Sequence, residues 1–116
     1  KLDPTKLRTT YLPDTYQCVF AQYVRKRLKK LANASGIIAV FSTDEMKKDS
    51  LIMTDGSNFK RSAYGTISYL PAAFGGVCAS VVIRELLGQK VPLHKNPLKE
   101  KKKKQEQKKA KKAQNK

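Results

Sequence analysis

The chain has 116 residues and a formal net charge of +16, from 25 Lys and Arg against nine Asp and Glu. This length allows one domain at most. The lone His94 has no ligand-spaced neighbour and no Cys-x-x-Cys pair is present, which argues against a zinc site. A positive excess of this size favours a nucleic-acid partner. An ordinary basic domain with a solubilising tail and an anionic membrane surface are the alternatives.

The N-terminal third predicts a strand followed by an amphipathic helix. Residues 6–12 mix Leu, Thr and Tyr, which favour strands. Asp14 is a candidate N-cap with Gln17 three residues on, as in a capping box, so we expect a helix from about Asp14 to Leu31. Four apolar residues recur on one face of it: Phe20, Val24, Leu28 and Leu31.

Residues 36–43, GIIAVFST, predict the clearest strand. A continuous apolar run of this kind is typical of a strand buried on both faces in a parallel sheet under helices. Asp44 and Glu45 follow it, at the edge where open α/β sheets bind ligands. We interpret this pair as a loop or cap, and keep an acid–base pair as the alternative.

Residues 46–61 predict a long polar loop with a turn at Asp55-Gly56. Residues 63–83 then carry no charge. We expect a strand over residues 64–70, and a helix over 72–87 that Gly88 ends and that is buried on several sides. A membrane span fits the length of the uncharged stretch, but Pro71, three glycines and the change from strand to helix argue against it.

The last residues differ from the rest in composition. Residues 99–116 hold ten Lys, two Glu and nothing more apolar than Ala, so we expect a disordered basic tail. The predicted organisation is a folded part over residues 1–90, a linker over 91–98 and the tail over 99–116. Cys18 and Cys78 lie in apolar runs and are predicted to be buried free thiols, which suits a reducing compartment.

Basic side chains of the folded part are candidate contacts to RNA phosphates, with a solvated surface as the alternative. They lie on the first predicted helix and in the polar loop: Arg25, Lys26, Arg27, Lys29, Lys30, Lys47 and Lys48.

Three separate blocks resemble one family in order and spacing. Residues 2–8, LDPTKLR, precede a basic helix containing VRKRL; residues 40–43, VFST, are followed by an acid; and residues 65–75, GTISYLPAAFG, open the last helix. Together, over roughly residues 1–89, they resemble the C-terminal half of the tRNA threonylcarbamoyladenosine dehydratases. That family belongs to the superfamily of ubiquitin-activating enzymes and the related molybdopterin- and thiamine-pathway adenylyltransferases.

The resemblance implies an α/β fold, the C-terminal portion of a Rossmann-like adenylating enzyme with a mixed sheet and packed helices. It implies ATP-dependent cyclisation of threonylcarbamoyladenosine in tRNA through an adenylate. ATP and Mg²⁺ are implied for the full-length enzyme and none is bound by this segment alone. The implied partners are tRNA, the N-terminal half of the same enzyme and a second copy in a homodimer, in the cytoplasm, with mitochondrial association left open.

The sequence departs from the family at the nucleotide site. The family's glycine-rich loop and its ATP-handling residues lie in the N-terminal half, and Gly75-Gly76 does not fit such a loop, so no catalytic residue is assigned here. Tyr16-Gln17-Cys18 stands where the family usually has Asp-Pro-Leu. Two other functions stay open: a non-catalytic basic module that binds RNA or docks to a catalytic chain, and an activating enzyme for a ubiquitin-like protein.

Overall fold

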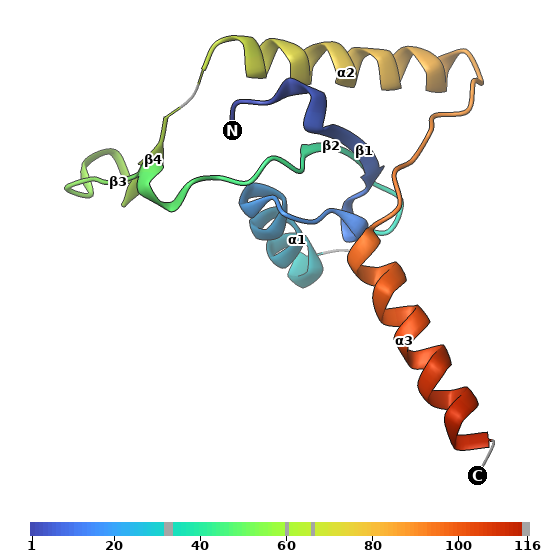
Figure 1. Ribbon diagram of the computed structural model, residues 1–116. Helices are drawn as coiled ribbons and strands as arrows, with labels where there is room; N and C mark the ends of the chain where they lie inside the picture. Colours follow the sequence, from blue (N-terminus) through green and yellow to red (C-terminus); the bar gives the residue numbers. More distant parts are fainter. Residues whose placement is uncertain (32–33, 60, 66, 115–116) are drawn as a thin grey trace.

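The chain has a mixed α/β architecture, as expected (Figure 1). The computed structural model describes residues 1–31, 34–59, 61–65 and 67–114, with the backbone alone at 48, 58, 113 and 114. The described helices and strands are β1 (Leu7–Tyr11), α1 (Val19–Leu31), β2 (Ile38–Ser42), β3 (Leu51–Met53), β4 (Ser62–Tyr64), α2 (Tyr69–Leu86) and α3 (Pro97–Gln114). Short 3₁₀ turns are η1 (Pro4–Lys6), η2 (Leu12–Asp14), η3 (Lys48–Ser50) and η4 (Ser57–Phe59).

The central sheet is an antiparallel ribbon of β1 and β2. Its register places Leu7 opposite Ser42 and Tyr11 opposite Ile38. Both predicted strands are confirmed, but the prediction of a parallel sheet is wrong. The apolar run of β2 is explained by helices on both sides of the ribbon, and a parallel arrangement is not needed for it. Helix α2 contacts β2 on one side, and α1 lies on the other side (Figure 1).

Helix α1 begins at Val19, five residues later than predicted. Residues 12–14 form η2 instead, and Gln17 has a positive φ of 50°, which interrupts any helix through this segment. The carboxylate of Asp14 contacts Lys99 and caps nothing in α1. The predicted capping box is therefore wrong.

The inward face of α1 is also rotated from the predicted one. Ala21 is buried, while Val24 and Leu28 are half-buried, so these three contact the rest of the chain. Phe20 and Leu31 are 77% and 80% exposed. The predicted apolar face thus divides into a covered part and an uncovered part.

The segment predicted as a long loop contains β3, which pairs with β4 in an antiparallel hairpin. The predicted turn at Asp55-Gly56 is confirmed: Gly56 has a φ of +85°, and Asp55 Oδ1 accepts a hydrogen bond from the backbone N–H of Ser57 at 2.9 Å. The strand expected over residues 64–70 is wrong: β4 ends at Tyr64 and α2 begins at Tyr69, and residue 66 between them lies outside the described residues.

The two ends of α2 carry the residues that the sequence predicts there. Pro71 lies in its first turn, and Gly88, with a φ of +66°, follows its end in the left-handed conformation that glycine adopts readily. The expected burial on several sides is wrong. Leu70 is its buried residue, and the side chains of Val82 and Leu86 are 57% and 81% exposed.

By length and composition alone, α2 could also cross a membrane. Its mean hydropathy is 1.3, and it is the one helix in the described part of the chain that meets this criterion. In this structure 6% of the helix is buried, so its apolar circumference is largely uncovered.

The segment after α2 returns to the ribbon. Val91 is buried, and the backbone N–H of His94 donates to the carbonyl of Thr9 at 2.7 Å. The chain then forms α3 where the sequence predicts a disordered tail. Asn96 Oδ1 accepts from the N–H of Leu98 at 2.9 Å as an N-cap, and Lys, Gln, Glu and Ala are all good helix formers.

The hydrophobic core lies between the ribbon and the two helices. Its buried apolar members are Leu12, Ala21, Phe41, Leu70 and Val91. Phe41 is 2% exposed and meets the ring of Tyr16 edge to face, with 5.5 Å between centroids. This is a small core, and much of the apolar surface of α1 and α2 lies outside it.

Candidate nucleic-acid interface

One face of α1 forms a basic hollow. Its volume is about 830 Å³, and it lies between α1, η2 and the residues after α1. We call it the basic hollow; its lining is Pro13, Gln22, Arg25, Lys26, Lys29, Lys30, Leu31, Ala34 and Ser35. The helix presents these cations because Ala21, Val24 and Leu28 turn its opposite side towards the core.

The cations of the basic hollow have two different roles. Arg25 is half-buried, and its guanidinium donates to the carbonyl of Thr15 at 2.9 Å and also to the Thr15 hydroxyl. Arg25 therefore holds the turn before α1. Lys26, Lys29 and Lys30 are exposed, so their ammonium groups are accessible to an anionic partner.

The other predicted cations lie apart from the basic hollow. Arg27 is exposed on α1 but does not line it. Lys47 follows β2 and lines a neighbouring hollow of about 640 Å³, which it shares with Gln22 and Arg25. The side chain of Lys48 lies outside the described residues. The structure thus gathers four of the seven predicted residues and connects Lys47 to them through Arg25.

Sequence reasoning missed Lys99 as a neighbour of this surface. Its ammonium donates to the carbonyl of Pro13 at 3.3 Å and contacts the Asp14 carboxylate. The signal available in the sequence was Asn96-Pro97, a helix start that would have fixed where the Lys-rich segment leaves the body.

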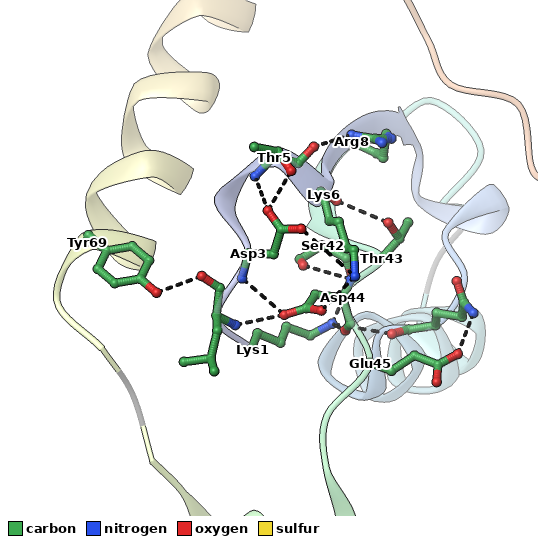
Figure 2. Close-up of polar contacts among 12 residues, drawn as sticks. Lys1, Asp3, Thr5, Lys6, Arg8, Ser42, Thr43, Asp44, Glu45 and Tyr69 are labelled. Carbon is green, nitrogen blue, oxygen red and sulfur yellow. Dashed lines mark hydrogen bonds and ion pairs between the residues drawn. The ribbon is translucent and has the colours of Figure 1, made fainter.

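A second polar cluster surrounds Asp44 (Figure 2). Its Oδ2 accepts from the backbone N–H of Leu2 at 2.7 Å and of Asp3 at 3.2 Å, and its Oδ1 contacts Lys6 Nζ at 3.2 Å. These bonds, above all the one from Leu2, hold the pKa of the Asp44 carboxyl well below its ordinary value. Lys1 Nζ donates to the carbonyl of Ser42 at 2.8 Å, and burial lowers its pKa.

This second cluster is a structural clasp. Asp44 is ionised at neutral pH with its oxygens occupied, so it does not suit proton transfer there. Glu45 Oε1 accepts from Gln17 Nε2 at 2.8 Å. Both contacts support the interpretation of the acidic pair as a loop and cap. In the described part of the chain, no three His, Cys, Asp or Glu side chains gather as metal ligands.

The two cysteines are free, and one prediction about them is wrong. Cys18 is half-buried, but Cys78 is exposed on α2 because that face of the helix is uncovered. Burial therefore no longer argues against a thiol nucleophile at Cys78. Thiol trapping of a ubiquitin-like protein on Cys78 decides that alternative.

The three blocks of the family resemblance meet at the Asp44 clasp. Leu2 and Asp3 of the first block bind Asp44, which follows the second block, across about forty residues of chain. Tyr69 of the third block donates its hydroxyl to the carbonyl of Leu2 at 2.6 Å (Figure 2). Segments that are far apart in the sequence thus form one contact network.

No protein-family model matches the chain, and neither a curated protein nor a solved structure matches it. The resemblance therefore rests on the three blocks themselves.

Proposed function

We propose that the chain is the C-terminal part of an ATP-dependent tRNA threonylcarbamoyladenosine dehydratase, where it completes a Rossmann-like fold and contacts tRNA through the basic hollow. The observation that carries this proposal is the network at Asp44. The blocks on which the resemblance rests make direct hydrogen bonds to one another through Leu2 and Tyr69. Motifs that belong to one functional fold are expected to pack in this way.

The chain's own residues do not fit the nucleotide. Gly75 and Gly76 lie in the interior of α2, where backbone N–H groups are used by the helix and cannot cradle phosphates. In the proposal, ATP and Mg²⁺ are therefore held by the N-terminal half of the enzyme. This chain supplies fold and RNA contact and no catalytic residue.

The uncovered apolar surface supports a larger assembly. Phe20 on α1 and Ile83 and Leu86 on α2 are more than half exposed, on elements that flank the same ribbon. Because α1 and α2 lie on opposite sides of the ribbon, these side chains form two separate apolar surfaces, and exposed apolar surface can mark an interaction site. We assign them to the N-terminal half of the enzyme and to a second copy in a homodimer.

The RNA contact is electrostatic. Lys26, Lys29 and Lys30 present three exposed ammonium groups on one side of α1. Lysine binds phosphate as a point charge and displaces counterions, so the affinity should fall steeply with salt.

The test is ATP-dependent cyclisation by the complete reading frame on tRNA carrying threonylcarbamoyladenosine. A triple variant, Lys26→Gln with Lys29→Gln and Lys30→Gln, is expected to raise KM for tRNA and to reduce the salt slope by about three. The charge-matched control changes Arg84, Lys90 and Lys95 to Gln, all exposed and outside the basic hollow. A complete reading frame without cyclisation activity would refute the proposal.

The second candidate is a non-catalytic RNA-binding or docking module. It is favoured by the basic hollow together with the absence of a phosphate-cradling loop among the described residues. An upstream coding sequence with a strand, a glycine-rich loop and a helix supports the enzyme. A start codon directly before Lys1 supports the module.

A further inference from the structure

The basic hollow and helix α3 meet at η2. Pro13 lines the basic hollow, and its carbonyl accepts from Lys99 Nζ in the first turn of α3. Lys99 also contacts the carboxylate of Asp14, and Asn96 Nδ2 donates to the Asp14 carbonyl at 3.0 Å. Figure 1 shows α3 leaving the body beside η2 and α1.

Asn96 is the joint between α3 and the body. Its side-chain oxygen caps the helix, with a bond from the N–H of Leu98, while its side-chain nitrogen binds the Asp14 carbonyl. One side chain thus starts α3 and fixes the direction in which it leaves. The Lys99–Asp14 pair is partly exposed and adds little stability by itself.

Helix α3 is a long cationic surface. It carries nine Lys and two Glu over 18 residues, so it is about 27 Å long at 1.5 Å per residue. Its side chains are exposed from Pro97 to Lys112, with lysines on all sides. The two acids, Glu100 and Glu106, leave a large positive excess along the whole helix.

Neither surface carries an aromatic side chain. The lining of the basic hollow and the sequence of α3 contain no Phe, Tyr, Trp or His. Proteins that bind single strands use aromatic side chains as stacking platforms for the bases. Lysines without such platforms suit a regular phosphate backbone, and duplex RNA is recognised through its shape and its phosphates.

We propose that α3 and the basic hollow form one continuous surface that binds double-stranded RNA through its backbone, with α3 as an arm fixed at Asn96. This rests on the proposed function, since it names the part of the RNA that the chain contacts. The duplex lies along α3 and reaches Lys26, Lys29 and Lys30 on α1. Recognition is independent of base sequence.

The test compares two variants of equal charge in the full chain. Asn96→Asp keeps an N-capping oxygen but removes the donor to the Asp14 carbonyl, which frees the arm without removing its helix. Gln107→Glu adds the same charge at an exposed position of α3. The probe is a 20-base-pair RNA duplex of mixed sequence, with binding followed by fluorescence anisotropy over a range of salt.

Asn96→Asp is expected to weaken duplex binding about 10-fold more than Gln107→Glu, because two linked surfaces lose their mutual placement. Far-ultraviolet circular dichroism should show the same helix content in both variants. Equal affinities for the two variants would overturn the fixed arm. Equal affinity for a single-stranded RNA of the same length would overturn the claim that the surface selects a duplex. Equal affinity for a DNA duplex would overturn the claim that it selects RNA.

These results are separable from the proposed function. Duplex binding is measured on the chain alone, without ATP and without a modified nucleoside. A complete reading frame that fails to cyclise tRNA leaves the duplex measurement unchanged, and loss of duplex selectivity leaves the cyclisation measurement unchanged.

Discussion

The carboxylate of Asp44 accepts a hydrogen bond from the backbone N–H of Leu2 at 2.7 Å, across 42 residues of sequence. The same carboxylate binds Asp3 and Lys6, so the first turn of the chain is held against the end of β2. The clasp is electrostatic and lies near the surface. It should therefore respond to pH.

The first prediction concerns acid stability. The folded pKa of Asp44 is below the ordinary value of 3.8, so its stabilising contribution is present at neutral pH and is lost as pH falls below about 4. The free energy of unfolding, measured in urea between pH 7 and pH 3, should fall in this range. Asp44→Asn should remove part of that fall, whereas the exposed Asp49→Asn should retain it. An unchanged pH profile in Asp44→Asn would contradict the role of the clasp.

The second prediction separates the formed core from the uncovered surface. Phe41→Ala should lower the free energy of unfolding by about 3–5 kcal/mol, because it empties a buried site. Phe20→Ala should change it by less than about 1 kcal/mol in this chain, because the ring is exposed. Urea denaturation checks both. A large loss of unfolding free energy in Phe20→Ala would mean that this face of α1 is already covered in the chain.

The third prediction uses two glycines of opposite role. Gly76→Ala should raise the free energy of unfolding by about 0.5–1 kcal/mol, since its added Cβ meets nothing within 4 Å and alanine favours the helix. Gly88→Ala should lower it by about 1–2 kcal/mol, because its φ of +66° is strained for alanine. Thermal unfolding of the two variants gives opposite shifts, and shifts of the same sign would contradict the described end of α2.

The fourth prediction distinguishes the two kinds of cation on α1. Arg25→Gln should lower the free energy of unfolding by about 1–2 kcal/mol, because the carbonyl and hydroxyl of Thr15 lose their donor. Lys29→Gln should leave stability within about 0.5 kcal/mol and reduce the salt slope of RNA binding by about one. The prediction is wrong if both variants affect stability and binding alike.

The sequence was sufficient to predict those elements that depend on local interactions along the chain. β1, β2 and the two ends of α2 follow from residue type, from Pro71 and from Gly88. The start of α1 was missed because Gln17 adopts a positive φ. The turn that contains Gln17 is held by two distant residues, since Arg25 binds the Thr15 carbonyl and Glu45 binds Gln17 itself. The burial of α2 was missed because an apolar pattern does not say what covers the helix.

The candidate site was predictable in part for the same reason. The helical repeat places Lys26, Lys29 and Lys30 together, and the sequence is enough to see that. The contribution of α3 was not predictable, because the Lys99–Asp14 pair joins residues 85 positions apart. A composition of Lys, Glu, Gln and Ala also fits disorder and a solvated helix equally well.

The hydrogen bond between His94 and Thr9 makes the two edges of the ribbon different. In the register of β1 and β2, the backbone groups of Thr9 point away from β2, and His94 occupies that side. The outward groups of β2 belong to Ile38, Val40 and Ser42, and Lys1 reaches the carbonyl of Ser42. The described residues place no strand beside Ile38 and Val40, so an additional strand would have room at this edge of β2, whereas His94 occupies the corresponding edge of β1.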